Sequence, residues 1–79
     1  MHDTIEQRLR GALAVDHLDI VLDGNRCSIA IASDDFEGLN PVRRQQLVYQ
    51  HIGDFISSGE IHAVTINAMT AAQWLERDS

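Results

Sequence analysis

The feature that most constrains this chain is a turn signal flanked by two segments of alternating polarity. Asp23-Gly24-Asn25 is a residue combination typical of tight hairpin turns. On both sides of it, larger apolar residues alternate with polar or smaller ones, a pattern that indicates half-buried strands. The apolar positions are Leu18, Ile20 and Leu22 before the turn and Cys27, Ile29 and Ile31 after it. The sequence therefore predicts an antiparallel hairpin with one apolar face.

Helical patterns precede and follow this hairpin. Asp3 begins a capping-box pattern, and the apolar residues after it recur at helical spacing, which predicts a helix that ends near residues 14–16. A central helix is predicted to begin at Pro41, with Asn40 as its cap, because proline suits the first turn of a helix. Gly53 weakens the middle of this helix, and we expect a break into two shorter helices there.

A third strand and a final helix complete the pattern. The run from Ile61 to Thr70 has β-branched residues at its centre, and its alternation puts His62, Val64 and Ile66 on one face. Thr70 can cap a short helix that carries Trp74. The predicted order is helix, strand, strand, one or two helices, strand, helix. Three strands in one sheet with helices on one face make a two-layer α+β domain.

Length and charge limit the classes of function. We expect the 79 residues to form a single domain, and the formal net charge of −6 disfavours a protein that tracks phosphate backbones. One cysteine, Cys27, excludes an intramolecular disulfide. The N-terminus lacks the pattern of a signal peptide, and no apolar run is long enough to span a bilayer. We therefore expect a cytoplasmic protein without a membrane contact.

Two side chains could carry metal chemistry. His62 stands at the mouth of the third strand, and a neutral imidazole is a good ligand for borderline metals, although a lone histidine can equally cap a nearby carbonyl. Cys27 offers a thiolate, the usual ligand of iron–sulfur clusters, but its alternation with apolar residues equally indicates a small buried hydrophobe. The residues alone leave both alternatives open for both side chains.

The remaining polar residues give weaker signals. Arg43 and Arg44 form a basic patch at the exposed start of the central helix, which could contact a partner or nucleic acid or be an ordinary solvated face. We expect the other histidines, His2, His17 and His51, to face solvent. No nucleophile with an adjacent base, no phosphate loop and no Cys-x-x-Cys motif occurs, so we do not expect an enzyme.

Two sequence blocks together resemble a known family. Ile61-His62-Ala63-Val64, followed by Thr70 and Trp74, resembles the C-terminal signature of the BolA-like proteins. Upstream, Phe36-Glu37-Gly38 and the run from Val42 to Tyr49 resemble the central motif of the same family, at the expected spacing. The resemblance covers roughly Thr4 to Trp74 and implies one BolA-like domain over residues 1–79. It also implies a three-stranded mixed sheet in an arrangement similar to the type II KH topology.

The resemblance also implies a function and a ligand. In BolA-like proteins the histidine that matches His62 is a ligand to a two-iron, two-sulfide cluster shared with a monothiol glutaredoxin, whose bound glutathione completes the site. The resemblance thus favours a non-enzymatic adaptor in cluster assembly or iron homeostasis. The alternative that it implies is a KH-like, nucleic-acid-binding transcriptional regulator that contacts DNA.

One position departs from the family pattern. The family's usual histidine after the hairpin turn falls on Arg26, which cannot ligate a metal because it stays protonated, and Cys27 follows it. A shift of one residue in a strand turns a side chain to the other face. We expect a bulge at the glycine-containing turn to bring Cys27 out beside His62, where it would be an accessible second ligand.

Overall fold

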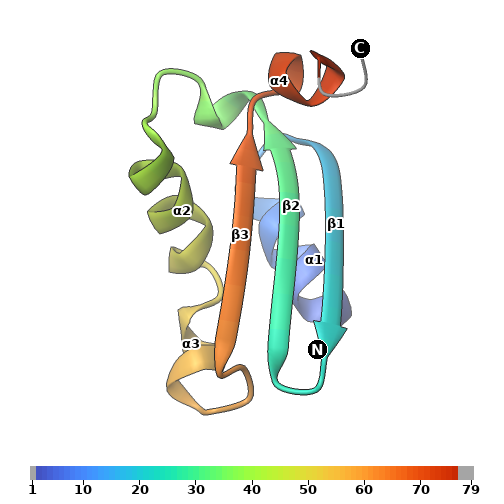
Figure 1. Ribbon diagram of the computed structural model, residues 1–79, viewed down its shortest axis with the longest axis vertical. Coiled ribbons are helices and arrows are strands. Elements are labelled where there is room, and N and C mark those ends of the chain that lie inside the picture. The colour runs from blue at the N-terminus through green and yellow to red at the C-terminus, as the bar shows by residue number, and fades with distance from the viewer. Residues whose placement is uncertain (1, 77–79) are drawn as a thin grey trace.

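The computed structural model describes residues 2–76. Helices precede, connect and follow its three strands (Figure 1). In chain order the elements are α1 (His2–Ala12), β1 (Val15–Asp23), β2 (Arg26–Ser33), the 3-10 helix η1 (Asp34–Phe36), α2 (Pro41–Gln50), α3 (Gly53–Ser57), β3 (Ala63–Met69) and α4 (Ala71–Glu76). The predicted order of elements is confirmed. The break in the central helix also occurs as expected, between Gln50 and Gly53.

The three strands form one mixed sheet in the order β1-β2-β3. β1 and β2 pair antiparallel through the tight turn at Gly24 and Asn25, where Gly24 has a φ of +61° that a larger side chain rarely adopts. β3 pairs parallel with β2, because the chain crosses back through α2 and α3 before it re-enters the sheet. The predicted α+β class with a mixed three-stranded sheet is therefore confirmed.

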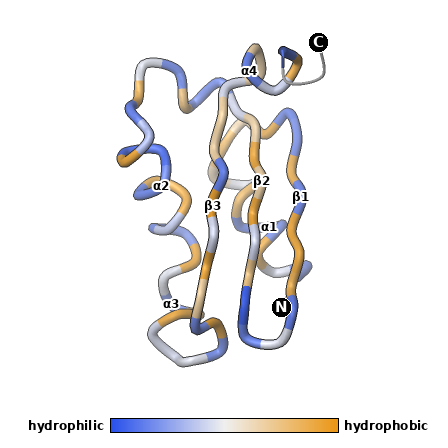
Figure 2. The backbone as a smooth tube through the Cα atoms, viewed as in Figure 1, coloured by the Kyte–Doolittle hydropathy of each residue, from blue (hydrophilic) through white to orange (hydrophobic). Residues whose placement is uncertain are grey.

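The hydrophobic core lies between the sheet and the helices. In Figure 1, α1 lies behind the sheet and α2 lies along β3. Both helices, the core-facing side of the sheet and the connecting segments contribute fully buried side chains, which are Ile5, Leu9, Ile31, Phe36 of η1, Val48, and Ile52 between α2 and α3. Figure 2 shows hydrophobic residues recurring along β1 and β2 and a hydrophilic tip where the two strands join. The alternation that the sequence shows thus becomes one buried and one open face of the sheet.

Two boundaries differ from expectation. α1 ends at Ala12 rather than within residues 14–16, because β1 already begins at Val15. His17 consequently lies within β1, not in a turn before it, and the β1–β2 register shifts between Val15 and His17. Within residues 2–76 no helix is long and apolar enough to cross a membrane.

Candidate functional site

His62 lies in the loop between α3 and β3, next to the hairpin turn. Its backbone N–H donates to the carbonyl of Asn25 at 2.8 Å, and the N–H of Ala63 reaches the same carbonyl at 3.4 Å. These bonds fix the backbone that carries His62 against the β1–β2 turn. The loop itself closes at Gly59, whose φ of +83° favours glycine.

The imidazole of His62 is exposed and takes part in no hydrogen bond or ion pair with any residue of the 2–76 range. A Cβ added at Gly59 would lie 3.8 Å from Nε2, so the ring lies close to the backbone of the loop. The expected alternative, in which His62 caps a nearby carbonyl, does not occur among these residues. A ring with no internal partner can offer a nitrogen lone pair to a ligand from outside the chain.

No set of ligands for a complete metal site accompanies this ring. Among residues 2–76 no group of three or more His, Cys, Asp or Glu side chains is arranged to hold a metal ion. Iron–sulfur clusters and structural metals need about four protein-derived ligands. Within these residues His62 is therefore not part of a metal site that the chain builds by itself.

Cys27 lies in the hydrophobic core. Its side chain is only 2% exposed, and burial raises the pKa of the thiol above its usual value. The expectation of a bulge at the turn is wrong, because Cys27 pairs with Leu22 of β1 and with Val64 of β3 in the regular register of β2. The two-residue turn closes without an extra residue, so Cys27 keeps the inward direction of Ile29.

Arg43 and Arg44 do not form one exposed patch. Arg43 is exposed, whereas Arg44 is half-buried and donates from Nε to the carbonyl of Leu39 at 2.9 Å and from Nη1 to Oε1 of Gln73 at 2.8 Å. Arg44 thus ties α2 to α4. The expectation of an exposed basic pair is corrected, because one of its two guanidinium groups is engaged within the fold.

The stack of His17 on Trp74 was missed at the sequence level. The ring centroids lie 3.6 Å apart with an interplanar angle of 18°, and both side chains are half-buried. His17 therefore does not simply face solvent, as expected, but anchors α4 to the start of β1. These residues are far apart in sequence, so no local pattern could have paired them.

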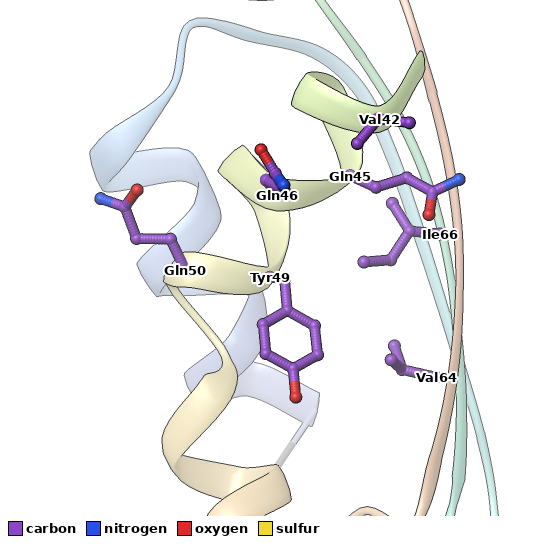
Figure 3. A pocket seen from close by; sticks show the side chains of 7 residues that line it. All are labelled: Val42, Gln45, Gln46, Tyr49, Gln50, Val64 and Ile66. Carbon is purple, nitrogen blue, oxygen red and sulfur yellow. The ribbon is translucent and has the colours of Figure 1, made fainter.

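A groove between α2 and β3 was also not anticipated. It has a volume of about 450 Å³ and is lined by Val42, Gln45, Gln46, Tyr49, Gln50, Val64 and Ile66. Figure 3 shows the tyrosine ring and the two β3 side chains on opposite walls of this groove. Two of its lining residues, Val42 and Tyr49 of α2, are 64% and 43% exposed. These two side chains on the outer side of the helix were the sequence feature that could have indicated the groove.

Comparisons with known proteins give consistent matches. A family model described as BolA-like protein matches residues 9–73. An uncharacterized protein encoded in the rpoN-murA intergenic region of Acinetobacter guillouiae is 36% identical over 72 residues, which cover 91% of this chain and 87% of that protein. The acid stress protein IbaG of Escherichia coli (strain K12) is 32% identical over 73 residues, which cover 92% of this chain and 87% of that protein.

Solved structures match over the whole fold. The crystal structure of a bol-like protein from Babesia bovis has a TM-score of 0.89 at 26% identity and covers 100% of this chain and 94% of the other. The solution structure of BolA1 protein from Mus musculus has a TM-score of 0.82 at 30% identity and covers 98% of this chain and 70% of the other.

Proposed function

This chain belongs to the BolA-like family, and from that membership together with the geometry of His62 we propose that it is a non-enzymatic adaptor that binds a monothiol glutaredoxin. In that complex it would help to hold a two-iron, two-sulfide cluster for cluster assembly or iron homeostasis. Such an adaptor would work in the cytoplasm, where thiols stay reduced.

The observation that carries the proposal is the state of the His62 ring. The ring is exposed, has no partner within residues 2–76, and stands on a backbone that two hydrogen bonds attach to the hairpin turn. A ligand held on a fixed backbone loses little freedom on binding, which favours a shared metal site. Of the histidines, His2 contacts the carbonyl of Ile20 at 3.1 Å and His17 stacks on Trp74, so both have internal roles.

The partner must supply the other ligands. The described residues contain no ready-made group of metal-binding side chains beside His62. A glutaredoxin thiolate and the thiolate of its bound glutathione are suitable iron ligands because soft thiolates favour iron–sulfur clusters. This chain would contribute an imidazole, and an imidazole in place of a thiolate raises the reduction potential of a cluster.

The proposal rests on His62 and not on Cys27. A ligand role for Cys27 stays a prediction, and it would require β2 to separate locally from β1 and β3, because the thiol is buried between them and the helices. Arg26, the exposed residue beside it, has only hydrogen-bond donors on its guanidinium group and cannot replace it as a ligand.

Reconstitution of a mixed complex tests the proposal. The protein and a monothiol glutaredoxin are combined with glutathione, iron and sulfide, and the visible circular dichroism spectrum is compared with that of glutaredoxin alone. We expect a distinct spectrum for the mixture and its loss or change with His62→Ala. His51→Ala is the matched control, because it removes a half-buried imidazole without changing the loop that carries His62.

Two outcomes would contradict the proposal. One is a spectrum of the mixture that equals that of glutaredoxin alone, and the other is a His62→Ala mixture indistinguishable from the wild type. Salt-dependent binding of duplex DNA in the absence of any effect on the cluster spectrum would instead favour the nucleic-acid alternative.

A further inference from the structure

Arg8 of α1 contacts the junction between α2 and α3 at three points. Its Nη1 donates to the carboxylate of Asp54, the second residue of α3, and to the carbonyl of His51 at 3.4 Å. Its guanidinium carbon lies 4.6 Å from the centroid of the Phe55 ring, within the range of a cation–π contact. A planar guanidinium group suits this place, because it can donate from its edge while its face stacks on a ring. One side chain thus joins α1 to both helices that lead into β3.

The short helix α3 has few other attachments. It is five residues long, none of its residues is fully buried, and no side chain caps its first turn. A helix of this length is not stable by itself, so its position depends on its contacts with the rest of the fold. Its apolar contacts with the core come from Phe55 and Ile56, which are both half-buried. Arg8 therefore holds one of the two side chains by which α3 is packed.

The end of α3 determines the surroundings of the His62 ring. In Figure 1, α3 lies at the same end of the sheet as the turn between β1 and β2. The carbonyl of Phe55 accepts from the N–H of Ile61, the residue before His62, at 3.1 Å. The N–H of Gly59 donates to the carbonyl of Ile56 at 3.1 Å, and a Cβ added at Gly59 would lie 3.8 Å from Nε2 of His62. The space around the imidazole thus depends on where α3 ends.

From these contacts we propose that Arg8 is a positioning residue for His62. Arg8 holds α3 against α1, and α3 holds the loop backbone that lies beside Nε2. Among residues 2–76 no hydrogen bond or ion pair joins Arg8 to His62 itself, so Arg8 acts only through α3. A ligand whose direction is set in advance loses less freedom when it binds. The consequence for a cluster rests on the proposed function, whereas the effect on the ring in the isolated protein does not.

The alternative is that Arg8 forms an ordinary surface ion pair. Exposed pairs of this kind contribute little to global stability, and Arg10 forms one with Glu6 at 3.1 Å on the same helix. That pair joins two turns of one helix, whereas Arg8 joins separate elements and also stacks on a ring. Removal of Arg8 should therefore disturb α3 and the loop after it while the sheet stays intact. Arg10→Ala is the matched control, because it removes the same type of side chain and an ion pair from α1.

The first measurement uses the isolated full chain. Wild type, Arg8→Ala and Arg10→Ala are labelled with ¹⁵N and ¹³C, and amide hydrogen exchange and the ring signals of His62 are recorded by NMR at one fixed pH. The amides of Gly59 and Ile61 should exchange at least about tenfold faster in Arg8→Ala, because both are bonded to carbonyls of α3. The ring signals of His62 should also shift in Arg8→Ala. Arg10→Ala should change neither, and the amides of β2 report any global opening.

The second measurement uses the mixture with a monothiol glutaredoxin, glutathione, iron and sulfide. The visible circular dichroism signal of the shared cluster is followed after addition of the iron chelator bipyridine. We expect the Arg8→Ala mixture to lose the cluster at least about threefold faster than the Arg10→Ala mixture, because residues that orient a ligand contribute to the affinity of the site. Arg8→Lys keeps a charge for Asp54 without the planar group that faces Phe55, so its rate should lie between those of the wild type and Arg8→Ala.

Three results would overturn the inference. The first is an Arg8→Ala variant that matches Arg10→Ala in amide exchange and in the ring signals of His62. The second is exchange that accelerates equally in the loop and in β2, because Arg8 would then support the fold as a whole. The third is equal loss of the cluster from the two mixtures. Failure of the proposed function looks different: the wild-type mixture would lack a distinct spectrum, and the NMR measurement would still decide the role of Arg8.

Discussion

The two ends of the sheet use their polar side chains in opposite ways. At the α4 end, formed by residues 33–35 and 70–74 with His17 and Arg44, side chains bind one another or the backbone. At the turn end, formed by residues 23–26 and 59–63, only backbone groups connect the segments. There, the exposed side chains of Asn25, Arg26 and His62 make no hydrogen bond or ion pair with the described residues.

Side-chain hydrogen bonds hold the α4 end, in addition to the stack of His17 on Trp74. Thr70 and Gln73 form a reciprocal cap at the start of α4, with bonds of 3.0 and 3.2 Å. Arg44 joins the same Gln73 to α2. On the other side, the carboxylate of Asp35 accepts from the backbone N–H of Ala14 at 2.8 Å.

The difference teaches which side chains remain available for function. Side chains that satisfy the backbone at the α4 end cannot be replaced without loss of stability, because backbone groups, some of them part-buried, would lose their partners. Apart from Ile61, which is buried in the core, the side chains at the turn end contribute little to the fold and can be reserved for an outside ligand. The predictions below test this contrast, from the largest expected effect to the smallest.

Trp74→Ala should lower the free energy of unfolding by about 2 kcal/mol, less than the roughly 3–5 kcal/mol typical of a fully buried ring. The reason is that Trp74 is half-buried and stacks on His17. Urea unfolding followed by far-ultraviolet circular dichroism measures the effect. His17→Ala should cost about 1 kcal/mol, because it removes the stack alone. If both variants unfold at the same urea midpoint as the wild type, the stack does not stabilise the α4 end.

Arg44→Ala should cost about 1–2 kcal/mol of stability, because two hydrogen bonds from a charged donor are lost in a half-buried position. The matched variant Arg43→Ala should change stability by less than about 0.5 kcal/mol, since Arg43 is exposed. Thermal unfolding of the two variants compares neighbouring residues of the same type. Equal midpoints would show that the contacts of Arg44 add nothing to the fold.

Cys27 should react slowly with thiol reagents, although it lies near the turn end. Burial raises the pKa of its thiol, so the reactive thiolate is scarce and shielded in the native protein. Titration with a thiol reagent should be at least about a hundredfold slower in the native than in the unfolded protein. A fast native reaction would mean that β2 opens readily, and it would return Cys27 to the list of accessible ligands.

The ion pair between Arg8 of α1 and Asp54 of α3 should make the contact between these two helices sensitive to acid. The hydrogen bond from Arg8 holds the pKa of the Asp54 carboxyl below its usual value of about 3.9. A lowered pKa in the folded state adds stability above the usual pKa, and this stability disappears as the pH falls through the lowered value. Asp54→Asn should flatten the stability profile below about pH 4; an unchanged profile would show that the pair adds nothing.

His62→Ala should change the free energy of unfolding by less than about 0.5 kcal/mol, because the exposed ring has no partner among residues 2–76. Denaturant unfolding of the isolated protein checks this, apart from any effect on a cluster. A loss of more than about 1 kcal/mol would mean that the ring supports the loop at Gly59, and the contrast between the two ends would fail.

The sequence by itself determined the helices and strands and singled out His62 as a candidate ligand. Alternation around Gly24 predicted the hairpin, Pro41 and Asn40 marked the start of α2, and Thr70 marked the start of α4. These signals are local, since they arise from backbone preferences and from hydrogen bonds within three or four residues. The sequence also placed His62 at the mouth of β3, although its alternation put the ring on the face of Val64 and Ile66, whereas His62 is exposed and precedes the strand.

Only the tertiary structure decided which side chains are engaged. The stack of His17 on Trp74, the bonds of Arg44 to Leu39 and Gln73, and the groove beside β3 join residues whose proximity depends on the packing of whole elements. The direction of Cys27 was decided in the same way, because the register of β2 is fixed by both neighbouring strands and not by the glycine in the turn.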